Sequence, residues 1–159
     1  VMQFGVTVHV SGALLTGDPA ATLDANIEAA VTEATHFLET QIKMRTPHRT
    51  GNLSKSIQAE DIQGKGTPVV KGIVATSQSY ALPVETGTGI YGPKQVPFVI
   101  KAKPGKALFW PGADHPVKQV TIKGMVGAHM FENGFKENTA GLDRIFAKYG
   151  LKIVTELSQ

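Results

Sequence analysis

The sequence contains no cysteine. This absence excludes a disulfide framework, a thiolate zinc site, an iron–sulfur cluster and a cysteine nucleophile. Long hydrophobic runs are missing too, since no stretch approaches the roughly 20 apolar residues that cross a bilayer. The first dozen residues have neither the basic region nor the continuous apolar region of an export signal. We therefore expect a soluble protein that is not exported and does not contact a membrane.

The composition also lacks the marks of a disordered chain. Of 159 residues, 42% are hydrophobic and 18% are charged, a balance that supports a buried core. A chain of this length is typical of one domain. We therefore predict a single domain over residues 1–159.

Basic residues are absent from one end of the chain. Residues 1–40 hold five acids and no lysine or arginine, whereas residues 41–128 hold twelve basic residues against four acids. Such a chain can pair its acidic part with the basic part of a neighbour, or bind an anion with its basic part. Composition does not choose between these partners.

Hydrophobic periodicity predicts a strand followed by a long helix. Apolar and polar residues alternate over residues 2–10, a pattern typical of a half-buried strand. Asp18 then offers an N-cap and Pro19 a first helical residue, and apolar residues recur at helical spacing as far as Ile42. We predict an amphipathic helix of about seven turns that ends before Pro47.

The middle of the chain has the periodicity of strands. We expect strands at residues 56–62, 69–76, 96–101, 107–110 and 117–122. Gly64 and Gly66 predict a hairpin between the first two. Residues 86–106 are rich in glycine, proline and lysine, which predicts a projecting loop or β-arm. Helical spacing returns at residues 142–157.

These elements predict an α+β fold. We expect an antiparallel sheet of about four to five strands, with the long N-terminal helix and the C-terminal helix packed on one face. The projecting arm at about residues 86–106 would extend from this single domain.

Signals of catalysis are few. Residues 87–92 satisfy the spacing G-x-G-x-x-G, but a dinucleotide site needs a helix after the glycines, and Pro93 and Pro97 interrupt any such helix. The five histidines form no i, i+4 pair, and no carboxylate pair stands out. We therefore predict no catalytic, cofactor-binding or metal-binding residue, and a protein that is not an enzyme. A small hydrolase whose site assembles only in the fold stays an alternative.

A basic nucleic-acid-binding module is another alternative. Six lysines between residues 94 and 123 could line one surface, with Tyr91, Phe98 and Trp110 interleaved. The chain has only three arginines, so contact with DNA would be directed at phosphates and sensitive to salt. The same lysines also suit solvated strand edges that are protected against aggregation, and we favour that interpretation.

Two short segments are more distinctive. Residues 46–57 read T-P-H-R-T-G-N-L-S-K-S-I, directly after the long helix, and residues 80–88 read Y-A-L-P-V-E-T-G-T. In this order they resemble the neck or tail-completion proteins of long-tailed double-stranded DNA bacteriophages, whose members look like P-x-x-T-G-x-L-x-x-S-I and then Y-A-x-x-V-E-x-G-T. Both patterns are met at every fixed position. A weaker echo follows, where His129-Met130-Phe131 stands in place of a Pro-Phe pair that precedes the family's last helix.

The fixed residues of the first motif have physical roles of their own. Pro47 ends the long helix, and Thr50 caps the next turn. Gly51 permits a backbone angle that other residues resist. Leu53 and Ile57 lie one helical turn apart and pin the segment to the core. The motif is therefore a structural elbow.

The second motif has the spacing of a short helix. Tyr80, Ala81 and Val84 would be buried, and Glu85 precedes a hinge at Gly87 and Thr88 that starts the arm. We hypothesise that Glu85 makes a charge-assisted hydrogen bond to Arg49. This bond would tie the elbow to the hinge.

The resemblance implies a structural virion protein without catalysis. Such a protein would form a ring at the head–tail junction or at the top of the tail tube, after assembly in the host bacterial cytoplasm, and would complete the tail so that it joins the head. Its partners would be copies of itself, in a hexamer by the usual tail symmetry, and neighbouring neck, head-completion or tail-tube proteins. Non-specific contact with packaged DNA is compatible with this role. A tail terminator or minor tail protein is the alternative within the class.

A ring needs two different patches that complement each other on adjacent subunits. The acidic N-terminal part and the basic middle supply opposite charges, and the arm could become ordered on a neighbour. The arm residues expected at this interface are Gly89, Tyr91, Lys94, Phe98, Lys101 and Lys103.

Overall fold

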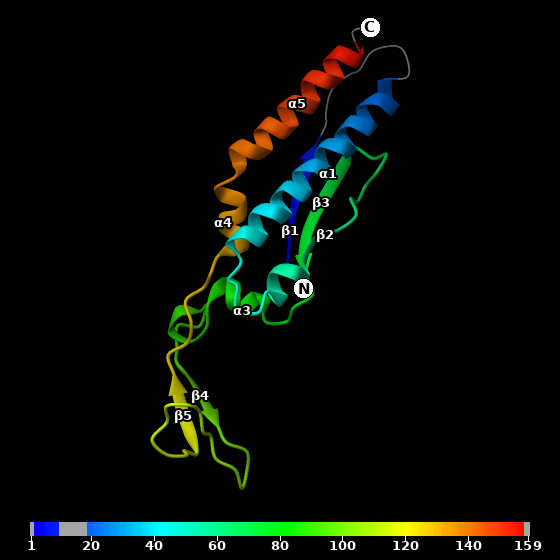
Figure 1. Cartoon of the computed structure of the whole chain (residues 1–159). Coiled ribbons are helices and arrows are strands. Elements are labelled where there is room, and N and C mark those ends of the chain that lie inside the picture. The colour runs from blue at the N-terminus through cyan, green and yellow to red at the C-terminus, as the bar shows by residue number, and fades with distance from the viewer. Residues whose placement is uncertain (1, 10–18, 158–159) are drawn as a thin grey trace. The chain divides into compact units, whose positions relative to one another are not determined.

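The computed structural model describes residues 2–9 and 19–157. Its contacts divide the chain into two compact units, a core unit of Val1–Ser79 with Met130–Gln159 and an arm unit of Tyr80–His129. Figure 1 shows the helices and strands of both. The prediction of a single domain stays a prediction.

The long helix α1, Pro19–Arg45, confirms the first prediction of helical periodicity. The helix ends before Pro47, and the buried hydroxyl of Thr46 donates a hydrogen bond to the Ile42 carbonyl at 2.8 Å. The cap predicted at Asp18 lies outside the described residues. The buried apolar residues of the helix fall on the predicted stripe: Ala30, Val31, Ala34, Leu38 and Ile42.

A three-stranded antiparallel sheet lies against α1 in the core unit (Figure 1). Its strands are β1, Met2–His9, β2, Ile57–Ala59, and β3, Val69–Thr76, in the order β1-β3-β2. Residues 2 and 57 both pair with residue 76, one from each side of β3. The predicted hairpin between β2 and β3 is confirmed. The alternation predicted for the side chains of residues 2–10 lies outside what the structure describes.

Close packing joins the sheet to α1. A Cβ added at Gly72 of β3 would overlap the Thr35 hydroxyl. Thr35 is buried, and its hydroxyl donates to the Val31 carbonyl at 2.6 Å. The helix and the central strand therefore approach each other only because residue 72 has no side chain.

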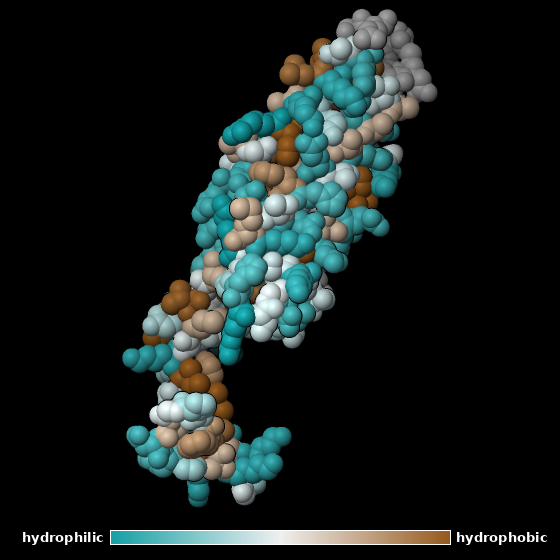
Figure 2. Space-filling model, viewed as in Figure 1, coloured by the Kyte–Doolittle hydropathy of each residue, from teal (hydrophilic) through white to brown (hydrophobic). Residues whose placement is uncertain are grey.

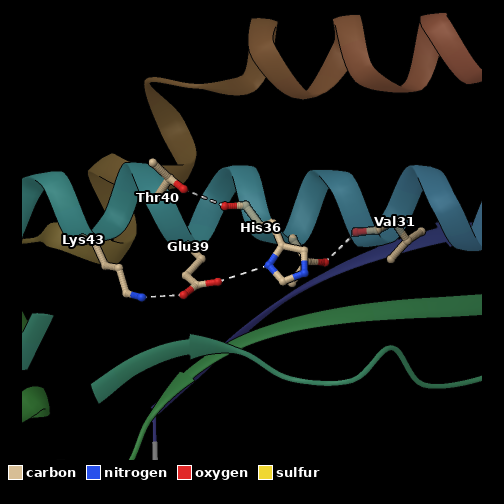
Figure 3. Close-up of polar contacts among 6 residues, drawn as sticks. Val31, His36, Glu39, Thr40 and Lys43 are labelled. Carbon is tan, nitrogen blue, oxygen red and sulfur yellow. Dashed lines mark hydrogen bonds and ion pairs between the residues drawn. The ribbon is translucent and has the colours of Figure 1, made fainter. Parts of the chain in front are cut away.

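Glu39 of α1 makes polar contacts with two other side chains of the same helix (Figure 3). Lys43 Nζ donates to Glu39 Oε1 at 2.5 Å, and His36 Nδ1 lies 3.2 Å from Glu39 Oε2. Burial acts to raise the pKa of Glu39, but hydrogen bonds from Lys43, His36 and the Ala59 backbone outweigh it and lower that pKa. Glu39 is therefore held in its charged form at neutral pH.

Two C-terminal helices, α4, Met130–Lys136, and α5, Thr139–Leu157, pack on α1. Helix α5 is the predicted terminal helix, whereas α4 was not anticipated. Met130 and Phe131 are fully buried, so the residues that replace a Pro-Phe pair are part of the core. A Cβ added at Gly134 would lie 2.6 Å from Ile42 Cγ1, which shows how closely α4 and α1 pack.

The arm unit contains two short helices and two strands. The helices are α3, Ala81–Thr86, and the 3-10 helix η1, Gly89–Tyr91. The strands are β4, Phe98–Lys101, and β5, Gln119–Ile122, which pair antiparallel with Phe98 opposite Ile122.

The prediction of one sheet of four to five strands is wrong. In the described part of the chain the strands form two separate sheets, one of three strands and one of two. Residues 107–110, predicted as a strand, make only an isolated bridge between Leu108 and Val117. Periodicity locates a strand but does not say which strand it pairs with. The strands that come after α3, β4 and β5, pair with each other and not with the core sheet.

Candidate functional site

The base of the arm unit is formed by an outgoing and a returning leg of the chain. The backbone N–H of Thr88 donates to the Met125 carbonyl at 2.8 Å, and that of Ile90 donates to the Lys123 carbonyl at 2.7 Å. Farther back, the N–H of Ala128 donates to a carbonyl of α3 at 2.8 Å. The two legs are therefore held together before the chain reaches β4.

Glycines allow the legs to approach this closely. A Cβ added at Gly89 would overlap the Lys123 carbonyl, and one at Gly124 would overlap the Thr88 carbonyl. One at Gly87 would lie 2.8 Å from two backbone atoms of the returning leg. Glycines of the G-x-G-x-x-G run thus serve backbone packing. The run itself contains the short 3-10 helix η1, and no α-helix of the kind that binds phosphate follows it before β4.

Beyond the base, the arm unit exposes apolar side chains. All four residues of β4 are exposed, and β5 alternates exposed and half-buried residues. The loop that joins the strands exposes Phe109 and Trp110. Twelve of the sixteen large hydrophobic residues exposed in the described chain lie in the arm unit, and Figure 2 shows hydrophobic surface there. The two-stranded sheet therefore has no buried face of its own.

The arm unit is also basic. It holds six lysines and no arginine, against Glu85 and Asp114, so its formal charge is +4. Since the whole chain carries +3, the core unit carries −1. An apolar surface within a basic unit suits a partner that is apolar at its centre and acidic at its rim.

The structure brings the predicted arm residues into this unit. Gly89 and Tyr91 bound η1, and Phe98 and Lys101 bound β4. Contact with a neighbour stays a prediction for these residues. Sequence reasoning missed the returning leg, although Gly124 and Gly127 repeat the spacing of glycines that marks the outgoing leg. The predicted residues with exposed side chains are Tyr91, Lys94, Phe98, Lys101 and Lys103.

The first motif forms the elbow that the sequence predicts, with one correction. Helix α2, Asn52–Ser56, is preceded by Gly51 at φ 75°, and Leu53 and Ile57 are buried. The cap predicted at Thr50 is wrong, because Gly51 occupies the N-cap position and no side chain caps the helix. The left-handed backbone of Gly51 directs the chain into α2, and no side-chain hydroxyl is needed as a cap.

The second motif forms α3, again with one correction. Ala81 is buried and Val84 half-buried, but Tyr80 is 42% exposed, so its predicted burial is wrong. Tyr80 is the N-cap residue and lies before the helix turn that buries Ala81. Glu85 is buried within the arm unit, and Arg49 of the core unit is exposed. Their pairing stays a prediction.

A cleft of about 430 Å³ lies between α1 and α5 in the core unit. Its walls are mostly apolar, with Ile27 and Ala30 from α1 and Phe146 and Ile153 from α5. Gly150 of α5 widens it, because a Cβ there would meet no atom within 4 Å. The sequence stripes locate both helices but do not reveal that they leave space between them.

Asn26 is a buried polar residue in the wall of this cleft. Its side chain is 4% exposed, and its amide donates to the Thr22 carbonyl at 2.8 Å and to Glu156 Oε2 at 2.7 Å. The amide oxygen has no hydrogen-bond partner among the described residues, and an unpaired buried oxygen costs about 1–3 kcal/mol. A polar residue within the apolar stripe of a helix was the available sequence signal.

Glu33 of α1 joins α1 to α5 through hydrogen bonds from two side chains of α5. Lys148 Nζ donates to Glu33 Oε2 at 2.6 Å, and the Tyr149 hydroxyl donates to the same oxygen at 2.9 Å. These bonds, the one from Lys148 first, lower the pKa of Glu33. In turn, the bond to Glu33 raises the pKa of Lys148 and of Tyr149. Glu33 stays ionised and links the two helices across their exposed edge.

Residues 2–9 and 19–157 were also compared with the features of metal sites and membrane-spanning helices, and they have neither. No three acidic, histidine or cysteine side chains gather there as a metal-binding group. In the same ranges no helix is both long and apolar enough to span a bilayer.

One comparison with known proteins gives a match. A family model described as "Bacteriophage HK97-gp10, putative tail-component" matches residues 18–87. Residues 18–87 are therefore similar to the HK97-gp10-like family of phage tail components. The matched segment runs through α1, the elbow, β2, β3 and α3, and holds the first motif and almost all of the second. This finding is consistent with the resemblance to neck and tail-completion proteins. Residues 88–159 lie outside the match, and no curated protein and no solved structure matches the chain.

Proposed function

We propose that this chain is a structural virion protein that completes the tail of a bacteriophage and joins it to the head. In this proposal it forms a ring at the head–tail junction or at the top of the tail tube, and it acts through shape and assembly, without catalysis. The match to a phage tail-component family supports the class of function. Tail terminator and minor tail protein are the alternative roles within that class.

The observation that carries the proposal is the exposed two-stranded sheet of the arm unit. An isolated pair of strands is marginally stable in water, and every residue of β4 is exposed. Large exposed apolar patches on a folded protein mark interaction sites. We therefore infer that a partner surface covers the arm unit, as happens when a subunit is part of an assembly.

A closed ring supplies such a surface. Each subunit of a ring presents one patch to the subunit ahead and a different patch to the subunit behind. The basic arm unit and α1, which carries four acids and no basic residue over residues 19–42, provide opposite charges. Charges of this kind set register and encounter rate, while apolar burial supplies most of the affinity. A ring of six copies, in contact with neck, head-completion or tail-tube proteins, fits the proposal.

A short-arm variant tests the proposal. Residues 99–121 are replaced by Asn-Gly, a two-residue turn suited to a hairpin, so that Phe98 and Ile122 stay paired and the base of the arm is kept. We expect the thermal unfolding of the core unit to be unchanged and both ring formation and completion of tails to be lost. Mass in solution, with and without tail tubes, and counts of joined particles measure this. Normal tail completion by the short-arm variant would contradict the proposal.

A basic nucleic-acid-binding module is the second candidate, favoured by the lysines of the arm unit. A four-lysine variant, with Lys101, Lys103, Lys106 and Lys118 all changed to Gln, separates it from assembly. Under the assembly proposal this variant associates more slowly, because charge sets the encounter rate, but still forms rings at high protein concentration, because its apolar surface is intact. Under the alternative it loses a duplex affinity that falls steeply with salt.

A further inference from the structure

Strand β1 lies at an edge of the core sheet, with half of its backbone groups pointing outward. The N–H of Glu60 donates to the Ile73 carbonyl, so the odd-numbered residues of β3 bond toward β2 and the even-numbered ones toward β1. The even-numbered residues of β1 pair with the latter. The backbone groups of Gly5 and Thr7 therefore point away from the sheet, and they have no partner among the described residues.

This edge lacks the usual protection of an exposed strand. Residues 2–9 contain no proline and no Asp, Glu, Lys or Arg, and they pair with β3 over their whole length without a bulge. Such an edge is a template for another strand. The opposite edge of the sheet differs, because the backbone of Ala59 in β2 bonds to Glu39 of α1. Within the described residues, the core sheet is therefore open to a further strand at β1.

The open edge of β1 forms one wall of the cleft between α1 and α5. Thr7 lines this cleft together with Phe146 and Ile153 of α5. Gly72 of β3 faces α1, so its neighbour Lys71 and the side chain of Thr7, which lies opposite Lys71, are on the other face of the sheet. Thr7 therefore presents its backbone to the cleft. A strand that pairs with β1 would direct the side chains of one face into it.

Such a strand must carry no helix of its own, because α1 and α5 already form walls of the cleft. Each strand of the core sheet contacts α1, whereas β4 is exposed at every residue and β5 at every second one. The outer edge of β5 is occupied at both ends, since Val117 bonds to Leu108 and the Lys123 carbonyl accepts the N–H of Ile90. Among the described strands, β4 is therefore the one that fits.

Strand β4 also has an open edge. The N–H of Ala102, directly after β4, donates to the Lys118 carbonyl, so the even-numbered residues of β4 bond toward β5. The backbone groups of Val99 and Lys101 therefore point outward, and they have no partner among the described residues.

The two faces of β4 match the two sides of this position. Residues directly opposite each other in an antiparallel pair have their side chains on the same face. With Val99 opposite Thr7, the side chains of Val99 and Lys101 lie on the open face of the sheet. Phe98 and Ile100 then lie on the other face, in the apolar cleft. A parallel strand would reverse the faces and bury the lysine.

We propose that β4 of one copy pairs antiparallel with the open edge of β1 in a second copy, with Val99 opposite Thr7. Phe98 and Ile100 would be buried between β1 and α5. The inference rests on the proposed ring and names its contact. The arm of each subunit would add a strand to the core sheet of the next, which is the head-to-tail contact that a ring requires.

Cross-linking tests the pairing, because the chain has no cysteine of its own. Residues opposite each other in a hydrogen-bonded pair have Cα atoms about 5.5 Å apart, which is within disulfide range. Rings made from a mixture of Thr7→Cys and Val99→Cys chains should therefore form a disulfide between copies on oxidation. Ile100→Cys is the matched control, since its side chain lies on the opposite face, and it should not cross-link to Thr7→Cys.

The outcomes of this experiment separate the inference from the ring proposal. Rings that form without a link between Thr7→Cys and Val99→Cys would overturn the inference and leave the ring standing. A chain that forms no ring, even with tail tubes, would overturn both. Links among Thr7→Cys chains alone would overturn the choice of β4. A link within single chains that carry both cysteines, at every dilution, would overturn the choice of a second copy.

Hydrogen exchange of the unaltered chain gives a second test. The N–H groups of Gly5, Thr7, Val99 and Lys101 would all be bonded in the ring, so their exchange should slow about tenfold or more relative to the monomer. Unchanged exchange at Thr7 in assembled rings would contradict the pairing.

A matched pair of variants tests the faces of β4. Ile100→Gln would bring an amide into the apolar cleft and should weaken association about tenfold or more. Val99→Gln places the same amide on the open face and should leave association nearly unchanged. Both residues are exposed in the arm unit, at 39% and 48%, so the two variants affect the free arm alike. Equal losses in the two variants would contradict the proposed orientation.

Discussion

Gly89 and Gly124 stand where two backbones touch at the base of the arm. Each would place an added Cβ into a carbonyl of the opposite leg. The sequence signalled the run of glycines and excluded a nucleotide site, but only the structure shows that the second set of glycines faces the first. The sequence alone was therefore enough to reject a nucleotide site at these glycines. Why glycine is needed there became visible only when the structure showed the two legs in contact.

Gly89→Ala should open the base of the arm. The substitution adds a methyl group at φ 64° against the Lys123 carbonyl, and we expect a loss of about 3 kcal/mol, about 1–2 from the backbone angle and the rest from overlap. Hydrogen exchange of the Ile90 and Met125 amides measures the opening. Gly105→Ala is the matched control, because its φ is 74° and no atom lies within 4 Å, so it carries only the cost of the angle. Equal exchange in both variants would contradict the packing role.

Glu33→Gln should destabilise the protein at neutral pH but not in acid. The hydrogen bond from Lys148, with that from Tyr149, lowers the pKa of Glu33 in the folded chain. The stabilisation is therefore present above the ordinary glutamate pKa of about 4.3 and is lost as the pH falls through the lower folded value. Urea unfolding at pH 7 and at about pH 3 checks this. A difference between the variant and the parent chain that is as large in acid would be inconsistent with the sign.

Residue roles followed from sequence where one local rule decided them. Gly51 has the positive φ that its place in the elbow predicts, and Leu53 and Ile57 are buried at helical spacing. The predictions for Thr50 and Tyr80 were wrong because both residues lie at helix starts, where a shift of one position changes the cap and the buried face. Asn26 was not singled out, although it is a polar residue within the apolar stripe of α1, because that stripe alone does not show the cleft beside α5.

At the scale of elements, the contact between α1 and β3 depends on residue 72. We expect Gly72→Ala to lower the free energy of unfolding by about 1–3 kcal/mol through overpacking against Thr35. Thr35→Ala removes the overlapped hydroxyl, so the double variant should recover part of that loss. Thermal unfolding of the single and double variants gives the coupling. Strictly additive losses would show that the helix and strand do not meet at these residues.

The elements themselves were predicted best where periodicity is long. The predicted range of β3 agrees with the structure, and α1 ends where Pro47 requires it. The split of the strands into two sheets was missed because pairing depends on contacts distant in sequence. Helix α4 was missed because its seven residues are too few to show a period and contain Gly134. Its burial depends on the surface that α1 offers.

At the scale of the whole molecule, charge is divided unevenly between the two units. The arm unit carries +4 and the core unit −1. The sequence predicted a basic stretch over residues 41–128 and an arm at residues 86–106. Of that stretch, residues 41–79 carry six basic residues against two acids and belong to the core unit, so the predicted division of charge is not the division between the two units. It did not predict that the returning leg completes the arm unit, because the strand periodicity at residues 117–122 does not say that this strand pairs with residues 98–101. Function at this scale was read from two motifs, both of which belong to or adjoin the matched segment.

Electron microscopy of the assembled phage particle is the most direct test of the central claim, that this chain works by presenting complementary surfaces to copies of itself and to adjoining virion parts. We expect a closed ring of this chain at the head–tail junction or at the top of the tail tube, with each arm unit seated on the core unit of the next subunit. Particles that join head to tail without this chain at either position, or that hold it only as isolated monomers with exposed arms, would contradict the claim.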